Sequence, residues 1–127
     1  MKSVNKVILV GNLGQAPETK TLSRSGTLLT TVSLATNERA KGPDGEWKDR
    51  AEWHSVLFYG KLAEIARDYL RKGSKIYVEG RLRTDSWEDE HQQKRWRTHI
   101  VAEEVVMLDG KDNRQPEPPA EAYEGSF

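Results

Sequence analysis

The stretch KLAEIARDYLRK, residues 61–72, is the clearest helical segment of this 127-residue chain. Its apolar side chains recur three and four residues apart, so they share one face of a helix. They are Leu62, Ile65, Ala66, Tyr69 and Leu70. Gly73 follows, at a position where helices commonly end in the left-handed conformation. This spacing predicts a helix over 61–72, and the rest of the fold has to be built around it.

The segments on both sides of this helix have the composition and the alternation of β-strands. Turn-forming residues separate them, and the densest group, KGPDG at 41–45, predicts a hairpin tip. The expected strands cover residues 4–13, 27–36, 47–59, 75–85 and 95–108. In the strand at 75–85, alternation predicts that Ile76, Val78 and Leu82 face inward.

The resulting order is three strands, one helix and two strands. A small chain of this kind has to protect its sheet edges, and closing the sheet into a barrel does so most completely. The five-stranded OB-fold has this order, with its helix between the third and fourth strands. We therefore expect an all-β protein with a small α content, built as an OB-fold barrel. An α+β sandwich is the alternative that the pattern leaves open.

The end of the chain differs in composition from the rest. Three of the five prolines follow Gly110, and residues 111–127 contain two basic and four acidic side chains. We expect one OB-fold domain over residues 1–110 and a short acidic, proline-containing disordered tail over residues 111–127. Because the whole chain has a formal net charge of +0, any basic surface has to be local.

Composition also argues against several classes of function. The chain has no cysteine, which excludes disulfides and thiolate metal sites. No apolar run exceeds four residues, so we expect a cytoplasmic protein without a membrane span. The three histidines, His54, His91 and His99, lack the spacing of metal ligands, and no catalytic motif is present. We expect no metal, no cofactor and no enzymatic activity.

The tryptophans lie beside charged or polar residues rather than inside apolar runs. In the strand at 47–59, Trp47, Trp53 and Tyr59 share one parity, and the apolar residues Val56 and Phe58 have the other. Alternate residues of a strand point to opposite faces. The sequence therefore predicts an aromatic row on the face opposite the core.

The strand at 75–85 and the residues after it repeat this arrangement, because Arg81, Arg83 and Trp87 have the parity opposite to its apolar residues. Unpaired bases expose π faces that stack on aromatic rings, and Arg and Lys contact phosphates without reading sequence. The pattern thus predicts binding of single-stranded nucleic acid. The alternative is that these rings, Trp47 and Trp96 above all, cap the barrel ends or lie in a subunit interface.

Motifs along residues 4–108 resemble the bacterial single-stranded DNA-binding protein family. They are VNKVILVGNLG at 4–14, SLAT at 33–36, EWH at 52–54, YGKLAE at 59–64, YLRKGS at 69–74 and VEGRLRT at 78–84. The resemblance implies an OB-fold that assembles as a homotetramer and binds single-stranded DNA with little sequence preference. It also implies a cytoplasmic, nucleoid-associated protein that protects single strands during DNA replication, recombination and repair.

The resemblance further implies particular site residues. By motif, Trp53, Tyr59 and Trp87 are expected to stack on bases. Another stacking position of the family is occupied here by Ala40, and we offer Trp47 as its replacement. The cations expected to contact nucleic acid are Lys6, Lys61, Arg81, Arg83, Arg95 and Arg97.

His54 resembles a family position tied to subunit association, so its replacement is expected to loosen the homotetramer. Family tails end in a run of aspartates, a hydrophobic residue, proline and phenylalanine, and this tip docks on replication and repair proteins. Here Glu124 and Phe127 remain, but the aspartate run and the penultimate proline are absent. Docking of partners through this tail therefore stays open.

One alternative function belongs to a different class. The chain can be read as an OB-fold accessory module of the primosome or of recombination that acts mainly through protein contacts. In that case the aromatic row would bind a protein partner. Quenching of tryptophan fluorescence by single-stranded oligonucleotides distinguishes the two functions, because only base stacking brings nucleobases against the indoles.

Overall fold

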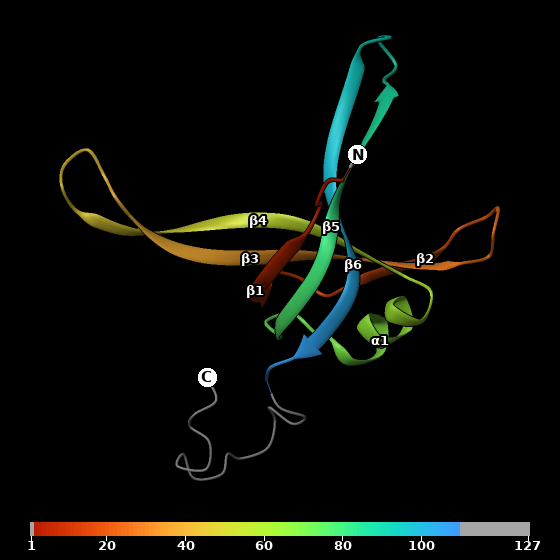
Figure 1. Ribbon diagram of the computed structural model, residues 1–127, viewed down its shortest axis with the longest axis horizontal. Helices are drawn as coiled ribbons and strands as arrows, with labels where there is room; N and C mark the ends of the chain where they lie inside the picture. The colour runs from red at the N-terminus through yellow and green to blue at the C-terminus, as the bar shows by residue number, and fades with distance from the viewer. Residues whose placement is uncertain (1, 110–127) are drawn as a thin grey trace.

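A five-stranded barrel forms the centre of the computed structural model, which describes residues 2–109 (Figure 1). Its strands, in order around the barrel, are β1 (Val7–Leu13), β5 (Lys75–Glu88), β6 (Lys94–Met107), β4 (Trp47–Tyr59) and β3 (Leu28–Lys41). The barrel closes because β1 pairs with β5 along Val7–Asn12 and with β3 at Asn12 and Leu13. The expected OB-fold barrel is confirmed, and the α+β sandwich is excluded.

The core follows the predicted alternation. Val32 and Leu34 of β3, Val56 and Phe58 of β4, and Ile76 and Val78 of β5 are all buried inside the barrel. Burial of each such side chain contributes about 1.5–3 kcal/mol to folding. The prediction for Leu82 was wrong, since its side chain is 49% exposed. By this residue β5 has left the barrel, after a register shift at Glu79/Gly80 and a close approach of Gly80 to Val101.

A sixth strand, β2 (Glu18–Thr21), was not predicted. It pairs with Leu28–Thr31 of β3, along the same edge that β1 uses at Leu34 and Ala35. The four residues ETKT are short and polar, so they carry no apolar alternation that would reveal a strand. The helix accordingly lies between β4 and β5, which are the third and fourth of the predicted strands.

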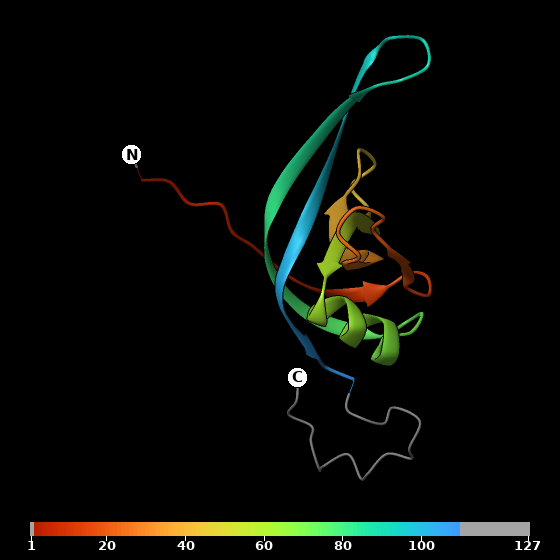
Figure 2. The ribbon, with the colours of Figure 1, turned by 90° about the vertical axis from the view of Figure 1, so that its right-hand side faces the viewer.

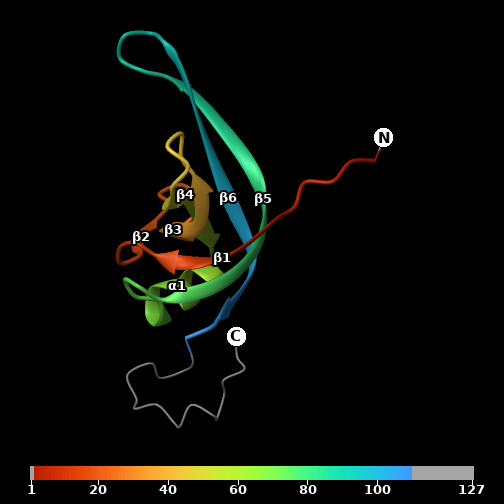
Figure 3. The same ribbon diagram turned by 90° about the vertical axis from the view of Figure 1, so that its left-hand side faces the viewer.

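Helix α1 (Lys61–Tyr69) covers the end of the barrel that lies away from the tip of the β5–β6 hairpin (Figures 2 and 3). Its residues Ala63 and Ala66 are fully buried, and the hydroxyl of Thr30 donates a hydrogen bond of 2.9 Å to the carbonyl of Ala63. The helix ends earlier than predicted, because Leu70 is extended and turns back into the core. Tyr69 is consequently exposed rather than part of the apolar face.

Two long hairpins extend beyond the barrel in different directions (Figure 1). The β3–β4 ladder runs from Leu29↔Tyr59 to Lys41↔Trp47, and the β5–β6 ladder runs from Ile76↔Met107 to Glu88↔Lys94. Both β3 and β5 are longer than predicted, because their outer halves are held by pairing across the hairpin and not by apolar burial. These arms carry Trp47 and Trp87.

The described residues before β1, residues 2–6, do not form a strand. The expected strand start at residue 4 moves to Val7, and the Asn5 side chain instead exchanges two hydrogen bonds of 2.9 Å with the backbone of Leu82. Between residues 2 and 109, no helix has the length and apolar character needed to cross a membrane. The predicted tail at 111–127 lies outside the described residues.

Candidate nucleic-acid interface

The β3–β4 ladder places three aromatic residues on one face of the sheet. Trp47, Trp53 and Tyr59 alternate regularly along β4, and their partners on β3 are Lys41, Ala35 and Leu29. Residues of one parity share a face. Trp47 and Trp53 are each 57% exposed, and Tyr59 is half-buried. The two indole rings are therefore open to solvent on the face opposite Val56 and Phe58.

The β5–β6 ladder supplies charged residues to the same region. The pairs Arg83↔His99, Asp85↔Arg97 and Trp87↔Arg95 share one face of this hairpin. That face meets β4, because the guanidinium of Arg83 donates a hydrogen bond of 2.9 Å to the Tyr59 hydroxyl. The combined surface is termed the aromatic face. Its residues are Trp47, Trp53, Ser55, Leu57, Tyr59, Arg83, Asp85, Trp87, Arg95, Arg97 and His99.

The position of the Trp53 ring depends on Gly14, just beyond the end of β1. A Cβ atom at Gly14 would overlap the six-membered ring of the Trp53 indole. The edge of this ring therefore occupies the space that a side chain at Gly14 would need, so the glycine allows the ring to take its present position. A stacking residue works best when its ring is held in place before the base arrives, because less conformational entropy is lost on binding.

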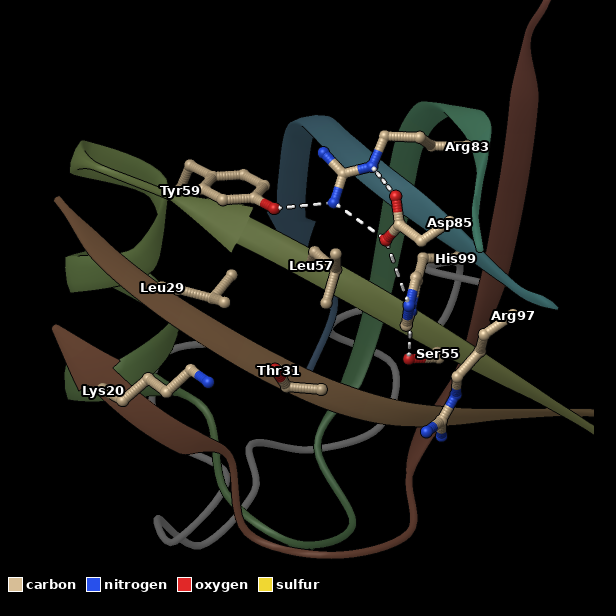
Figure 4. A pocket seen from close by; sticks show the side chains of 10 residues that line it. All are labelled: Lys20, Leu29, Thr31, Ser55, Leu57, Tyr59, Arg83, Asp85, Arg97 and His99. Atoms are coloured by element: carbon tan, nitrogen blue, oxygen red, sulfur yellow. Dashed lines mark hydrogen bonds and ion pairs between the residues drawn. The ribbon is translucent and has the colours of Figure 1, made fainter. Parts of the chain in front are cut away.

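A pocket of about 300 Å³ opens on the aromatic face next to Tyr59 (Figure 4). A chain of polar contacts crosses it. Arg83 binds the Tyr59 hydroxyl and lies 3.3 Å from the Asp85 carboxylate, and that carboxylate is 3.7 Å from His99 Nε2. His99 Nδ1 in turn lies 3.1 Å from Ser55 Oγ. The other lining residues are Lys20, Leu29, Thr31, Leu57 and Arg97.

Burial and neighbouring side chains shift the pKa values of His99 and Arg83 in this pocket. Burial lowers the pKa of His99 below its ordinary value of 6.5, and the guanidinium groups of Arg97 and Arg83 lower it further, against the opposing effect of Asp85. His99 is therefore neutral at neutral pH. The hydrogen bond to Tyr59 raises the pKa of Arg83, so Arg83 stays charged. Its guanidinium carbon also lies 5.7 Å from the centre of the Tyr59 ring, which is within cation–π range.

The remaining predicted cations are more dispersed. Lys6 forms an ion pair of 3.1 Å with Glu79, and Arg81 forms one of 3.4 Å with Glu103. Lys61 is exposed at the first position of α1. The pocket contains Arg83 and Arg97 but none of these three. Arg95 lies opposite Trp87 and pairs with Asp89 at 2.9 Å.

Trp47 and Trp96 lie near the tips of the two hairpins, and only Trp47 is on the aromatic face. Trp47 lies on the aromatic face, whereas Ala40 pairs with Lys48 on the opposite face of the same hairpin. Trp47 therefore extends the row formed by Trp53 and Tyr59, and it does not stand beside Ala40. Trp96 pairs with Ser86, which places it on the face of the β5–β6 hairpin opposite Trp87.

His54 and the tail complete the predicted site residues. His54 Nε2 lies 2.9 Å from the hydroxyl of Thr36, its neighbour on β3, and the side chain is half-buried. Glu124 and Phe127 lie outside the described residues. In the part of the chain from 2 to 109, no three or more acidic or histidine side chains are grouped in a way that could hold a metal ion.

Seven pocket residues were not predicted as site residues. They are Lys20, Leu29, Thr31, Ser55, Leu57, Asp85 and His99. Lys20 belongs to the short strand β2, which itself gave no signal. Asp85 has the parity of Arg83 and Trp87, so strand alternation could have placed it on the aromatic face. Nothing in the sequence connects His99 to Ser55, because they are 44 residues apart and meet only in the folded barrel.

Comparison with known proteins agrees with this geometry. The pattern of the Single-strand binding protein family matches residues 4–108. A single-stranded DNA-binding protein of Xylella fastidiosa is 49% identical over 112 residues, which are 88% of this chain and 68% of that protein. One from Xanthomonas axonopodis pv. citri is 51% identical over 110 residues, 87% of this chain and 61% of that protein. The chain thus spans about two thirds of the length of these relatives.

Solved structures lead to the same family. A Plasmodium falciparum SSB in complex with ssDNA superimposes with a TM-score of 0.77 at 34% identity, covering 86% of this chain and 98% of that one. A deletion mutant of the single-stranded DNA binding protein from Thermus aquaticus gives 0.72 at 30% identity, covering 85% of this chain and 52% of that one. The family match over 4–108 and identities near one half, on a barrel of the same fold, establish that this chain belongs to the single-strand binding protein family.

Proposed function

We propose that this protein binds single-stranded DNA with little sequence preference and protects it during DNA replication, recombination and repair. It acts by binding and not by catalysis. The observation that carries the proposal is the aromatic face, on which Trp53, Tyr59 and Trp87 occur together with Arg83, Arg95 and Arg97. Figure 4 shows Tyr59, Arg83 and Arg97 of this set.

Base stacking explains how this face selects single strands. Each base that stacks on an aromatic ring contributes about 1–3 kcal/mol, and every base has a π face, so the contact tolerates any sequence. Duplex DNA hides those faces inside the helix. We propose Trp53, Tyr59 and Trp87 as the principal stacking residues, with Trp47 extending the row along the β3–β4 arm. The phosphates are neutralised by the predicted cations, Lys6, Lys61, Arg81, Arg83, Arg95 and Arg97.

The outer surface of β1, β5 and β6 supports assembly into a homotetramer. Ile8, Val10 and Val106 are each close to half exposed, and Val10 pairs with Tyr77, which pairs with Val106. Isolated soluble domains seldom leave contiguous apolar patches of this kind uncovered. The edge of β1 at Val7–Val10 is bonded on one side, to β5, so its other side can accept a strand. We propose His54 as an additional subunit contact.

The predicted domain division also enters the proposal. Residues 1–110 form the OB-fold domain, and residues 111–127 form a short acidic tail in which Glu124 and Phe127 contact replication and repair proteins. The acidic residues of this segment and the apolar ring of Phe127 support this role. We place the protein in the cytoplasm, on the nucleoid. Removal of residues 111–127 is expected to leave the affinity for oligo(dT) intact.

A fluorescence titration tests the DNA-binding proposal. Oligo(dT) should quench the tryptophan emission strongly, and a duplex of the same length should not. The affinity should fall with salt by about 0.7 log units per phosphate contact for each tenfold rise in salt concentration. The double variant Trp53→Ala, Trp87→Ala should lose most of the affinity, whereas Trp96→Ala, on the other face of the β5–β6 hairpin, should retain it. Absence of quenching in the wild type would favour the protein-interaction module instead.

A further inference from the structure

Asp85 places a carboxylate on the aromatic face, which otherwise carries cationic side chains suited to a polyanion. Its contacts with Arg83 and His99 are long, so they do not use all the hydrogen-bond acceptor positions of the carboxylate. Its contacts are 3.3 and 3.4 Å to Arg83 and 3.7 Å to His99. Charge-assisted hydrogen bonds are normally about 2.7–2.9 Å long. A carboxylate offers roughly four acceptor positions, and the Asp85 side chain is 46% exposed. It therefore keeps acceptor capacity directed into the pocket.

The pocket has the shape and the chemistry of a site for one nucleobase. Its apolar part is formed by Leu29, Leu57 and the ring of Tyr59, and its polar wall by Asp85, His99 and Ser55 (Figure 4). A base has two apolar faces and a polar edge. If a base packs against Tyr59 and the two leucines, its edge is directed toward Asp85 on β5, which is separated from β4 by β6.

The side chains at the margin fit the same orientation. Lys20 on β2 and Arg97 on β6 also line the pocket, and their cationic ends can contact the phosphates before and after the bound nucleotide. A phosphate at the position of the base is disfavoured, because it would meet the Asp85 carboxylate. The neutral state of His99 leaves that carboxylate without a full counter-charge on this side.

We propose that this pocket is a nucleobase subsite in which Asp85 accepts a hydrogen bond from an exocyclic amino group, so that cytosine is favoured over thymine. The two pyrimidines have similar size and differ at C4, where cytosine carries an N–H₂ donor and thymine a carbonyl acceptor. A carboxylate accepts from the first and repels the second. The inference rests on the proposed binding of single-stranded DNA and adds a modest base preference to it.

The test compares the affinity for oligo(dC) with the affinity for oligo(dT) of equal length at one salt concentration. The quantity of interest is the ratio of the two affinities in each variant, because this ratio cancels general electrostatic effects. In Asp85→Asn both affinities rise, because a negative charge is removed from the binding face. The ratio of the oligo(dC) affinity to the oligo(dT) affinity falls by about tenfold, because one charge-assisted hydrogen bond to cytosine is lost. The matched control is Asp49→Asn on the β3–β4 arm, which removes the same charge outside the pocket and leaves the ratio unchanged.

A second probe keeps the test independent of how the variants fold. An oligomer of N4,N4-dimethylcytosine lacks the amino N–H donors, so it should lose the dC advantage with the wild-type protein. Against Asp85→Ala, which lacks both acceptor oxygens, oligo(dC) and the methylated oligomer should differ much less. Tight binding of both pyrimidines with a ratio that Asp85→Asn does not change would overturn the subsite. Failure of the wild type to bind either oligomer would instead overturn the proposed function itself.

Discussion

Gly14 shows how a single hydrogen in place of a side chain can position a binding residue. The edge of the Trp53 ring occupies the space where a Cβ atom at this position would lie. Gly14→Ala is therefore expected to displace the indole and weaken oligo(dT) binding by up to about tenfold, because part of one stacking contact is lost.

A double-mutant cycle shows whether this effect passes through Trp53. In a Trp53→Ala background there is no ring to displace, so Gly14→Ala should cause no further loss of affinity. Fluorescence or anisotropy titrations of the four proteins provide the comparison. Equal losses in both backgrounds would mean that Gly14 acts on the barrel as a whole and not on the ring.

His99 gives the folded protein a specific dependence on pH. Because its pKa is lowered in the folded state, the unfolded chain binds a proton at His99 at a pH where the folded chain does not. The free energy of unfolding should therefore decrease as the pH falls below about 6.5, and this contribution should vanish above it. Asp89 and Glu79 have pKa values below 3.8 and 4.5 respectively, so they titrate in a more acidic range.

Thermal unfolding at a series of pH values measures this contribution. The wild type should lose stability as the pH falls from about 6.5 toward 5, and His99→Gln should lose less over the same interval. The comparison is made without DNA, because ligand binding would itself shift the unfolding temperature. Identical slopes for the two proteins would show that His99 is protonated equally in both states.

At the scale of elements, one buried hydroxyl joins the helix to the sheet. Thr30 of β3 is fully buried, donates to the Ala63 carbonyl of α1, and lies 2.8 Å from the Thr19 hydroxyl of β2. Thr30→Val keeps the shape and removes these bonds, so it should lower the free energy of unfolding by about 1–3 kcal/mol.

Urea unfolding checks this prediction. Thr84→Val is the matched control, because Thr84 forms a similar hydroxyl pair of 2.9 Å with Thr98 but on the exposed β5–β6 arm. That variant should lose less than about 0.5 kcal/mol. Equal stabilities for the two valine variants would mean that water satisfies the groups around Thr30 as well as the protein does. Affinity for oligo(dT) should be unchanged in both.

The elements also show how far local patterns reach. The strand at 47–59 was predicted with the bounds that the structure has, because its alternation continues to a clear turn. The arms of β3 and β5 extended further than predicted, since polar residues in a two-stranded ladder follow no apolar pattern. The short strand β2 and the early end of α1 depend on contacts with β3 and with the core. Those contacts are not visible in the local sequence.

For the whole molecule, the apolar surface of β1 predicts how the subunits associate. Val10→Arg places a charge in the middle of the patch that Val10 forms with Tyr77 and Val106. Burial of an unpaired charge is costly, so the variant should form smaller species than the wild type at the same concentration. Light scattering gives the mass directly. Val4→Arg, at an exposed residue before β1, is the control and should keep the wild-type mass.

The sequence alone was enough to predict the order of the five barrel strands and the helix, the core positions other than Leu82 and Tyr69, and the parity of the aromatic row. These properties depend on the local period of side chains, which is two in strands and 3.6 in helices, so neighbouring residues are enough to reveal them. The family motifs added the expected stacking residues and single-stranded DNA as the expected ligand. The strand that carries Trp53 and Tyr59 could be assigned before any coordinates were known.

The surroundings of those rings could be seen only in the folded barrel. The pocket beside Tyr59 joins β2, β3, β4, β5 and β6, and its contacts link Arg83 to Tyr59 across 24 residues and Ser55 to His99 across 44. The close approach of the Trp53 ring to Gly14 and the opposite orientation of Trp87 and Trp96 likewise follow from strand pairing and register. Such contacts depend on how strands pair and how the barrel closes, and side-chain period along one strand carries no information about the strand beside it.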